Sequence, residues 1–349
     1  MFKYIKGSLL FTVLGLIAAM GFEWSQTGHV KTMIAAGLTA LILAVLEISL
    51  SFDNAVVNAT VIRNMDEVWK RRFLTWGILI AVFGMRLVFP LLIVTFVAHI
   101  NPVEAFMLSL NNPAEYARIM TSAHLTVSAF GGMFLYMVFL HFFINEEKDD
   151  HWVKVVEKPL ALLSQFKGVE IAIALITMLA ITSFMQEADQ IRFLIPGLWG
   201  MVTYMLVHSF SAWLEGLELT KKSGVDAKKS ILSAGFGMFL YLEVLDASFS
   251  FDGVVGAFAI TQSLVQIMIG LSIGAFFVRS LTLYLVEKET LNQIRFLEHG
   301  AFYALGALAL MMLLDYFFHI PEWMTGLTGA VILILSVIWS FHVDRKQRA

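Results

Sequence analysis

The sequence has 349 residues, of which 58% are hydrophobic and 15% are charged. This composition carries more apolar surface than one soluble core can bury, so a lipid bilayer is the expected solvent for much of the chain. The net charge of -3 leaves no basic stripe for a nucleic-acid partner, and the absence of cysteine excludes disulfides, thiolate metal sites and cysteine nucleophiles.

Apolar stretches long enough to cross a hydrocarbon layer of about 30 Å recur along the whole chain. No stretch between them is long enough to form a separate soluble domain. The sequence therefore predicts an all-α, polytopic transmembrane helical bundle of about ten spans that forms one domain over residues 1–349. The predicted spans cover residues 8–23, 32–52, 73–97, 123–144, 169–186, 193–213, 231–251, 266–286, 299–318 and 323–342.

Lysine and arginine residues sort unevenly between alternate loops of these ten spans. Of the 24 basic residues, nineteen fall on the side that holds both chain ends, three fall on the other side, and Arg86 and Arg279 lie inside spans. Cytoplasmic loops are enriched in basic residues, and a single missed helix would swap the sides of all later loops. The pattern predicts cytoplasmic termini and two cytoplasmic loops, over about residues 145–168 and 214–230.

An internal repeat links the two halves of the chain. Residues 46–54 align with residues 245–253, and both segments follow the pattern L-[ED]-x-S-x-S-F-D-[NG]. A second alignment one helix later places Gly77, Ile80, Phe83 and Arg86 on Gly270, Ile273, Phe276 and Arg279. Repeat one then covers about residues 32–97 and repeat two about residues 231–287. The loop charges give the two repeats opposite topology, which is typical of alternating-access transporters; alternatively, the duplication only records how the bundle arose.

Five carboxylates fall at mid-membrane depth in two matched clusters: Glu47, Asp53, Glu243, Asp246 and Asp252. A carboxylate near the bilayer centre costs on the order of 3 kcal/mol on insertion scales, so each needs a partner or a function. A straight helix would aim Glu47 and Asp53 in different directions. The serine-rich stretch of each motif therefore predicts broken helices that let the carboxylates converge. The predicted ligands of one cation are the oxygen-bearing side chains Asp53, Asp252, Glu47, Asp246 and Asn54.

Oxygen ligands without a thiolate suit manganese, magnesium or calcium better than zinc or copper. Buried carboxylates without a cation hold protons, so proton-coupled exchange is chemically available. The alternative is that the carboxylates pair with neighbouring helices only for packing. Arg86, Arg279 and Glu243 are candidates for gating or charge pairing, and a structural ion pair is the alternative for the two arginines.

Around these motifs the sequence resembles the TerC integral membrane family, which is named for tellurium resistance and is placed with the lysine-exporter-like transporters. Residues 47–54 resemble the first acidic motif of that family, which ends in Asp-Asn. Residues 246–253 resemble the second, which usually ends in Asp-Ser where this chain has Gly253. The resemblance implies manganese efflux across the bacterial inner membrane, with the two Asp motifs as metal ligands.

Taken together, the sequence predicts a divalent cation transporter that works by alternating access, with the cation and the lipid bilayer as its partners and no further cofactor. It does not set the oligomeric state. The alternative is a non-transporting membrane scaffold or sensor that binds metal and is linked to metal or tellurite resistance. An enzyme is not expected, because the chain has no nucleophile motif, no H-E-x-x-H helix and no phosphate-binding glycine loop.

Overall fold

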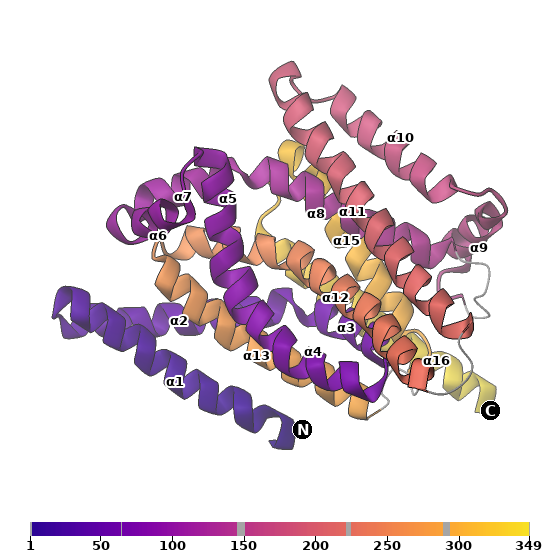
Figure 1. The fold of residues 1–349 in the computed structure, drawn as a ribbon, viewed down its shortest axis with the longest axis horizontal. Coiled ribbons are helices and arrows are strands. Elements are labelled where there is room, and N and C mark those ends of the chain that lie inside the picture. Colours follow the sequence, from indigo (N-terminus) through magenta and orange to yellow (C-terminus); the bar gives the residue numbers. More distant parts are fainter. Residues whose placement is uncertain (1, 64, 145–150, 221–224, 289–293, 349) are drawn as a thin grey trace.

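The computed structural model describes residues 2–63, 65–144, 151–220, 225–288 and 294–348. Within these ranges it describes every side chain except those of residues 2–4, 74, 215–220, 225–234, 251, 252, 322, 323, 344 and 346–348. No strand occurs in the described ranges, and helices make up nearly all of them (Figure 1). The predicted all-α class is confirmed.

The helices are α1 (Phe2–Thr27), α2 (Val30–Leu50), α3 (Phe52–Arg63), α4 (Glu67–Leu79), η1 (Ile80–Val88), α5 (Phe89–Ala98), α6 (Pro102–Asn111), α7 (Pro113–Ser122), α8 (His124–Phe143), α9 (Lys154–Leu162), η2 (Leu163–Gln165), α10 (Val169–Ser183), α11 (Glu187–Thr220), α12 (Val225–Ile260), α13 (Leu264–Glu287), α15 (Leu297–Phe318) and α16 (Glu322–Arg348). Segments α4, η1 and α5 follow one another without an intervening loop.

Among the described residues, eight helices are long and apolar enough to cross a membrane, and they coincide with eight of the ten predicted spans. The span predicted at residues 169–186 falls in α10, which forms with α9 and η2 a helix pair bent by 117°. The span predicted at residues 231–251 falls in α12, which is 36 residues long. The chain is therefore a multi-pass membrane protein.

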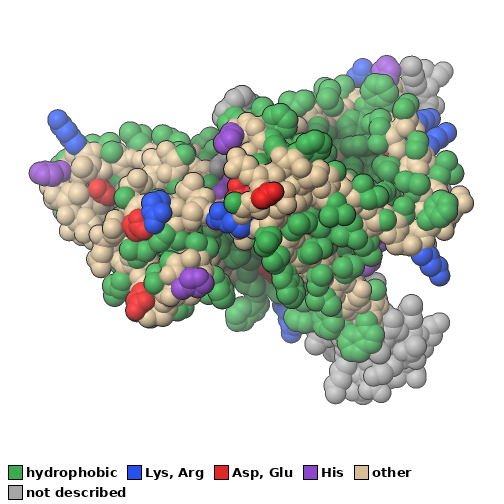
Figure 2. All heavy atoms as spheres, turned by 90° about the horizontal axis from the view of Figure 1, so that it is seen from above, with side chains coloured by type: hydrophobic (Ala, Val, Ile, Leu, Met, Phe, Trp, Pro, Cys, Tyr) green, Lys and Arg blue, Asp and Glu red, His purple; other side chains and the backbone are tan. Residues whose placement is uncertain are grey.

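The surface of the bundle fits contact with lipid tails. The apolar side chains of Leu10 and Ile17 on α1 and of Ile338 on α16 are 63%, 62% and 59% exposed. Helices that face water seldom expose many large apolar side chains together. Figure 2 shows broad areas of hydrophobic side chains, with charged side chains few and scattered. Both chain ends lie toward the lower edge of Figure 1.

The two repeats meet at the centre of the bundle. Helix α13 packs against α1, α2, α3 and η1, and α12 contacts α2, α3, α4 and η1. Beside this centre, α8 packs against both α11 and α15, and α16 packs against α15. The segment between spans at residues 214–230, predicted to be cytoplasmic, is mostly helical, since α11 continues to Thr220 and α12 starts at Val225. Of the loop predicted at residues 145–168, residues 145–150 lie outside the described part and α9 occupies much of the rest.

Candidate cation site between the two repeats

The first acidic motif contains a helix break at Ser51, one helical turn after Glu47. Helix α2 ends at Leu50 and α3 begins at Phe52, with Ser51 between them. The backbone N–H of Ser51 donates to the carbonyl oxygen of Glu47, and its hydroxyl donates to Glu47 Oε1 at 3.2 Å. The break predicted in repeat one is confirmed at Ser51, whose φ of -105° and ψ of 17° depart from helical values.

Glu47 forms a buried ion pair with Arg86. The Nη2 atom of Arg86 contacts Glu47 Oε1, and the two side chains are only 4% and 3% exposed. Arg86 lies on η1, a π-helical segment, and its Nη1 donates to the Ala81 carbonyl oxygen at 2.7 Å. π-Helical turns occur frequently at functional sites. The predicted charge pairing of Arg86 is thus present, between the helices of repeat one.

Asn54 connects the first motif to the second. Its Nδ2 donates to Asp246 Oδ1 at 2.9 Å. The Oδ1 atoms of Asn54 and of Asn58, one turn further along α3, are buried and have no hydrogen-bond partner among the described residues. Buried acceptors without donors are rare in native proteins and mark places where an ion or water can bind.

The two motifs cross in opposite directions. As the first motif advances from Glu47 to Asn54, the facing residues of the second motif go back from Gly253 to Asp246: a Cβ atom on Gly253 would lie 3.1 Å from Glu47 Oε2, while Asn54 bonds Asp246. The sequence repeat equates Glu47 with Asp246 and Asn54 with Gly253. The two contacts are therefore equivalent under a pseudo-two-fold relation, as inverted repeats require.

Two small cavities lie at this crossing. The central cavity, of about 30 Å³, is lined by Glu47, Ser51, Asn54, Asn58, Phe73, Ala81, Arg86, Asp246, Ala275, Val278, Arg279 and Thr282. The Asp53 cavity, of about 20 Å³, is lined by Glu47, Leu50, Ser51, Asp53, Phe249, Gly253, Leu308 and Thr325. Glu47 and Ser51 belong to both walls. A cavity needs roughly 10–15 Å³ to hold one water molecule, so each has room for about one or two particles of that size.

Asp53 occupies a position of its own on the α16 side of the motif. It is buried, and its Oδ1 accepts the backbone N–H of Asn54 at 3.0 Å. A Cβ atom on Gly329 of α16 would lie 3.1 Å from Asp53 Oδ2. Asp53 thus lines its own cavity and not the central one, and Glu47 lines both.

Repeat two differs from repeat one in its charge pairing. Arg279, the equivalent of Arg86, lies with its guanidinium carbon 3.7 Å from the centre of the Phe73 ring. Among the described side chains, its Nε and Nη2 atoms have no hydrogen-bond partner, and neither does Glu243 Oε1. Both groups border Gly77, where an added Cβ would lie 2.7 Å from Arg279 Nη2 and 2.8 Å from Glu243 Oε1. Arginine can stack on an aromatic face in this way without an ion pair.

The second motif also lacks the predicted helix break. Helix α12 continues through residues 245–253, and the Ser248 hydroxyl donates to the Val244 carbonyl oxygen within the helix. A serine that bonds back within its own helix leaves the helical ladder intact. The side chain of Asp252 lies outside the described residues. No group of three carboxylate or imidazole side chains in the described part is arranged to hold a metal ion.

Most of the predicted site residues therefore converge. Glu47, Asn54, Asp246, Arg86 and Arg279 share the central cavity, Asp53 borders the adjoining one, and Glu243 lies beside Arg279. Asn58 was not among the predicted ligands, although its spacing of four residues from Asn54 places both on one face of a helix.

The family model described as "Protein of unknown function (DUF475)" matches residues 52–347. The chain belongs to this family. The matched range takes in Asp53, Arg86 and the whole second motif of this DUF475 protein, and Glu47 lies just ahead of it. No curated protein and no solved structure matches the chain.

Proposed function

We propose that this DUF475 protein transports a divalent metal cation across the plasma membrane of a bacterium by alternating access. The observation that carries this proposal is the central cavity. It lies where two antiparallel motifs cross, and its wall combines Glu47 and Asp246 with the free amide oxygens of Asn54 and Asn58. Carboxylate and amide oxygens are the ligands that hard divalent cations prefer.

The size of the site favours an ion over an organic solute. A cavity of about 30 Å³ accommodates a metal ion or a water molecule, but not an amino acid or a sugar. The resemblance of both motifs to the TerC family supports manganese as the ion and efflux as the direction.

In a transport cycle, the charge of Glu47 must be neutralised both with and without a bound cation, and Arg86 can do this when the cation is absent. Arg86 neutralises Glu47 while no cation is bound, and the cation takes over this role when Arg86 withdraws. An isolated charge at this depth is costly, so one positive group is exchanged for another. Alternating access follows if the two inverted repeats rock against each other around this site.

The orientation follows from the charge distribution. We place both termini in the cytoplasm, because nineteen basic residues lie on that side and three on the other. Efflux then moves the cation from the end of the bundle near Lys70 and Arg71 to the end near Arg192.

The test is manganese flux into liposomes that contain the purified protein and a divalent-cation dye. Wild-type protein is expected to move manganese, and Asp246→Asn in the central cavity and Asp53→Asn in the adjoining one are expected to abolish the flux. Glu115→Gln is the matched control, because Glu115 is a carboxylate on α7, outside the predicted spans, that pairs with Arg118. Calcium and magnesium, run alongside, report selectivity.

Binding is measured on the same samples by calorimetry. Manganese binding without flux under any pH gradient would replace the transporter with the scaffold alternative. Absence of both binding and flux would show that the proposal is wrong.

A further inference from the structure

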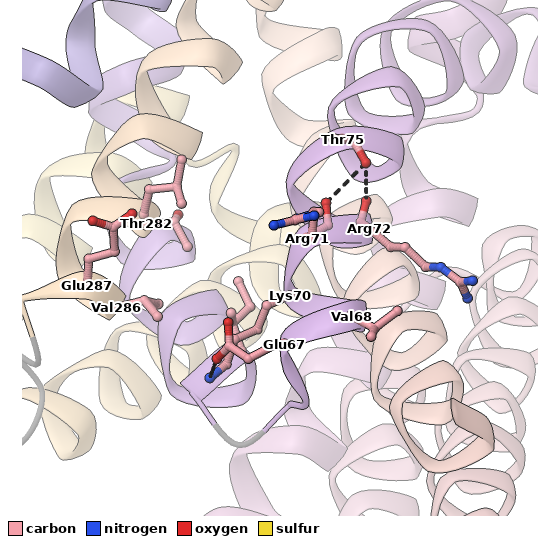
Figure 3. Close-up of a pocket in the computed structure, with 11 residues that line it drawn as sticks. Glu67, Val68, Lys70, Arg71, Arg72, Thr75, Thr282, Val286 and Glu287 are labelled. Carbon is pink, nitrogen blue, oxygen red and sulfur yellow. Dashed lines mark hydrogen bonds and ion pairs between the residues drawn. The ribbon is translucent and has the colours of Figure 1, made fainter. Parts of the chain in front are cut away.

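The two cavities at the motif crossing belong to a longer series. Beyond the central cavity, α3, α4 and α13 enclose a cavity of about 800 Å³, here named the Arg71 vestibule, which is lined by Ile62, Glu67, Val68, Lys70, Arg71, Arg72, Thr75, Thr282, Leu283, Val286 and Glu287. Figure 3 shows Thr282 and Glu287 on one side of this vestibule and Arg71 and Thr75 on the other. Thr282 also lines the central cavity, so the two spaces adjoin at this residue.

Two further cavities lie at the opposite end of the bundle. They measure about 470 and 230 Å³, and both are lined by His124, Ser128, Met312, Asp315 and His319. We name them together the Asp315 vestibule. Thr325 of α16 lines both this vestibule and the Asp53 cavity. Each cavity in the series therefore shares at least one lining residue with the next.

Both ends of the series are polar. In the Asp315 vestibule, Asp315 Oδ2 lies 3.4 Å from His124 Nδ1, and its Oδ1 accepts the backbone N–H of Ile320 at 2.7 Å. In the Arg71 vestibule, Lys70 pairs with Glu67 at 3.1 Å. Charged groups stay hydrated at low cost only where water reaches them, so both vestibules suit aqueous access.

The narrowest part lies beside Asp53. The cavity volume falls from about 230 Å³ in the adjoining part of the Asp315 vestibule to about 20 Å³ in the Asp53 cavity, whose lining includes Phe249, Leu308 and Thr325. Apolar constrictions of this kind gate membrane pathways by excluding water. Thr325 is the lining residue that the Asp53 cavity shares with the Asp315 vestibule, and the apolar side chains of Phe249 and Leu308 line the Asp53 cavity beside it.

We propose that these cavities form one cation pathway through the bundle, and that the Asp315 vestibule is the station where the cation is exchanged with the outside. Asp315 attracts the cation in this vestibule, and the pathway between the vestibule and Asp53 opens and closes at Thr325. This inference rests on the proposed transport function and adds the route and its outer binding site.

The route can be mapped by chemical labelling, because the chain has no cysteine and each introduced thiol is the only one present. Thr325→Cys and Ser128→Cys test the Asp315 end, and Thr282→Cys tests the Arg71 end. Thr328→Cys on α16 and Ser272→Cys on α13 are matched controls, because neither residue lines any of these five cavities. The reagents are a cationic and a neutral, membrane-impermeant methanethiosulfonate, applied to right-side-out and inside-out vesicles.

The expected result is labelling at Thr325→Cys and Ser128→Cys from the outside, labelling at Thr282→Cys from the cytoplasmic side, and little labelling of the controls. Adding Asp315→Asn should slow the cationic reagent at Thr325→Cys by about tenfold and leave the neutral reagent unchanged, because a charged vestibule concentrates counter-ions. Size-exclusion profiles matching wild type confirm that each variant is folded.

Two results would show that the proposed pathway is wrong. One is labelling of Thr325→Cys and Ser128→Cys from the outside at the same rate as the controls. The other is an equal effect of Asp315→Asn on the rates of the cationic and the neutral reagent. Labelling in the expected pattern without manganese flux in liposomes would keep the pathway and refute the proposed transport of that ion. Manganese flux without labelling at any route position would keep the transporter and refute this route.

Discussion

At the scale of single residues, the pair formed by Glu47 and Arg86 is the strongest electrostatic feature of the site. Removing one member of a buried ion pair strands the other charge and costs about 3–5 kcal/mol, whereas removing both costs much less. We therefore expect Glu47→Gln and Arg86→Gln each to lower the apparent unfolding temperature in detergent, and the double variant to unfold at a higher temperature than either. Strictly additive losses would contradict a direct pairing.

Gly253 is the residue at which the two motifs differ most in chemistry. A Cβ atom there would lie 3.1 Å from Glu47 Oε2, so Gly253→Ala crowds the carboxylate and should destabilise the fold by about 1–3 kcal/mol. Gly253→Ser should cost less, because its hydroxyl can donate to Glu47, a bond worth about 0.5–1.5 kcal/mol. Thermal unfolding of Gly253→Ala and Gly253→Ser in detergent shows which variant loses more stability. Equal losses would indicate that Glu47 moves aside freely.

At the scale of helices, the break in repeat one has no counterpart in repeat two. The first amides of α3 lack the bonds within a helix that the equivalent amides of the continuous α12 make. We expect peptides covering residues 48–56 to exchange amide hydrogen faster than peptides covering residues 247–255, in nanodiscs followed by mass spectrometry. Manganese should slow the exchange of the first segment. Equal protection of both segments without metal would argue against a hinge at Ser51.

The sequence was informative about helix positions because a bilayer imposes length and composition on every span, and eight of the predicted windows match helices that meet those limits. It could also predict the break in the serine-rich stretch of the first motif, which lies at Ser51. The break predicted near Ser248 was wrong, because a serine hydroxyl can bond inside its helix as easily as it can end one. Likewise, the stacking of Arg279 on Phe73 depends on how α4 packs against α13, which no local pattern encodes.

At the scale of the whole molecule, the candidate site arises only from the inverted pairing of the repeats. Asn54 and Asp246 are far apart in sequence, yet they bond across the crossing, and Thr282 and Thr325 border its two sides from α13 and α16. The approach of Gly253 to Glu47 and the bond between Asn54 and Asp246 are equivalent contacts, whereas the helix break and the ion pair occur in repeat one alone among the described residues. Arg86 and Arg279 are paired differently in this structure, since Arg86 contacts Glu47 and Arg279 stacks on Phe73.

The orientation of the whole bundle is the remaining property that a direct experiment can fix. The short turn at Gly28, between α1 and α2, should face the outside, and the end of α16 should face the cytoplasm. An epitope inserted after Gly28 should be removed by protease from intact spheroplasts, whereas one placed after the final residue should survive until the cells are opened. Cleavage of the C-terminal epitope in intact spheroplasts would show that the bundle has the opposite orientation. The proposed direction of transport, from the Arg71 vestibule to the Asp315 vestibule, would then also be wrong. Survival of both epitopes in intact cells would mean that α1 does not cross the membrane.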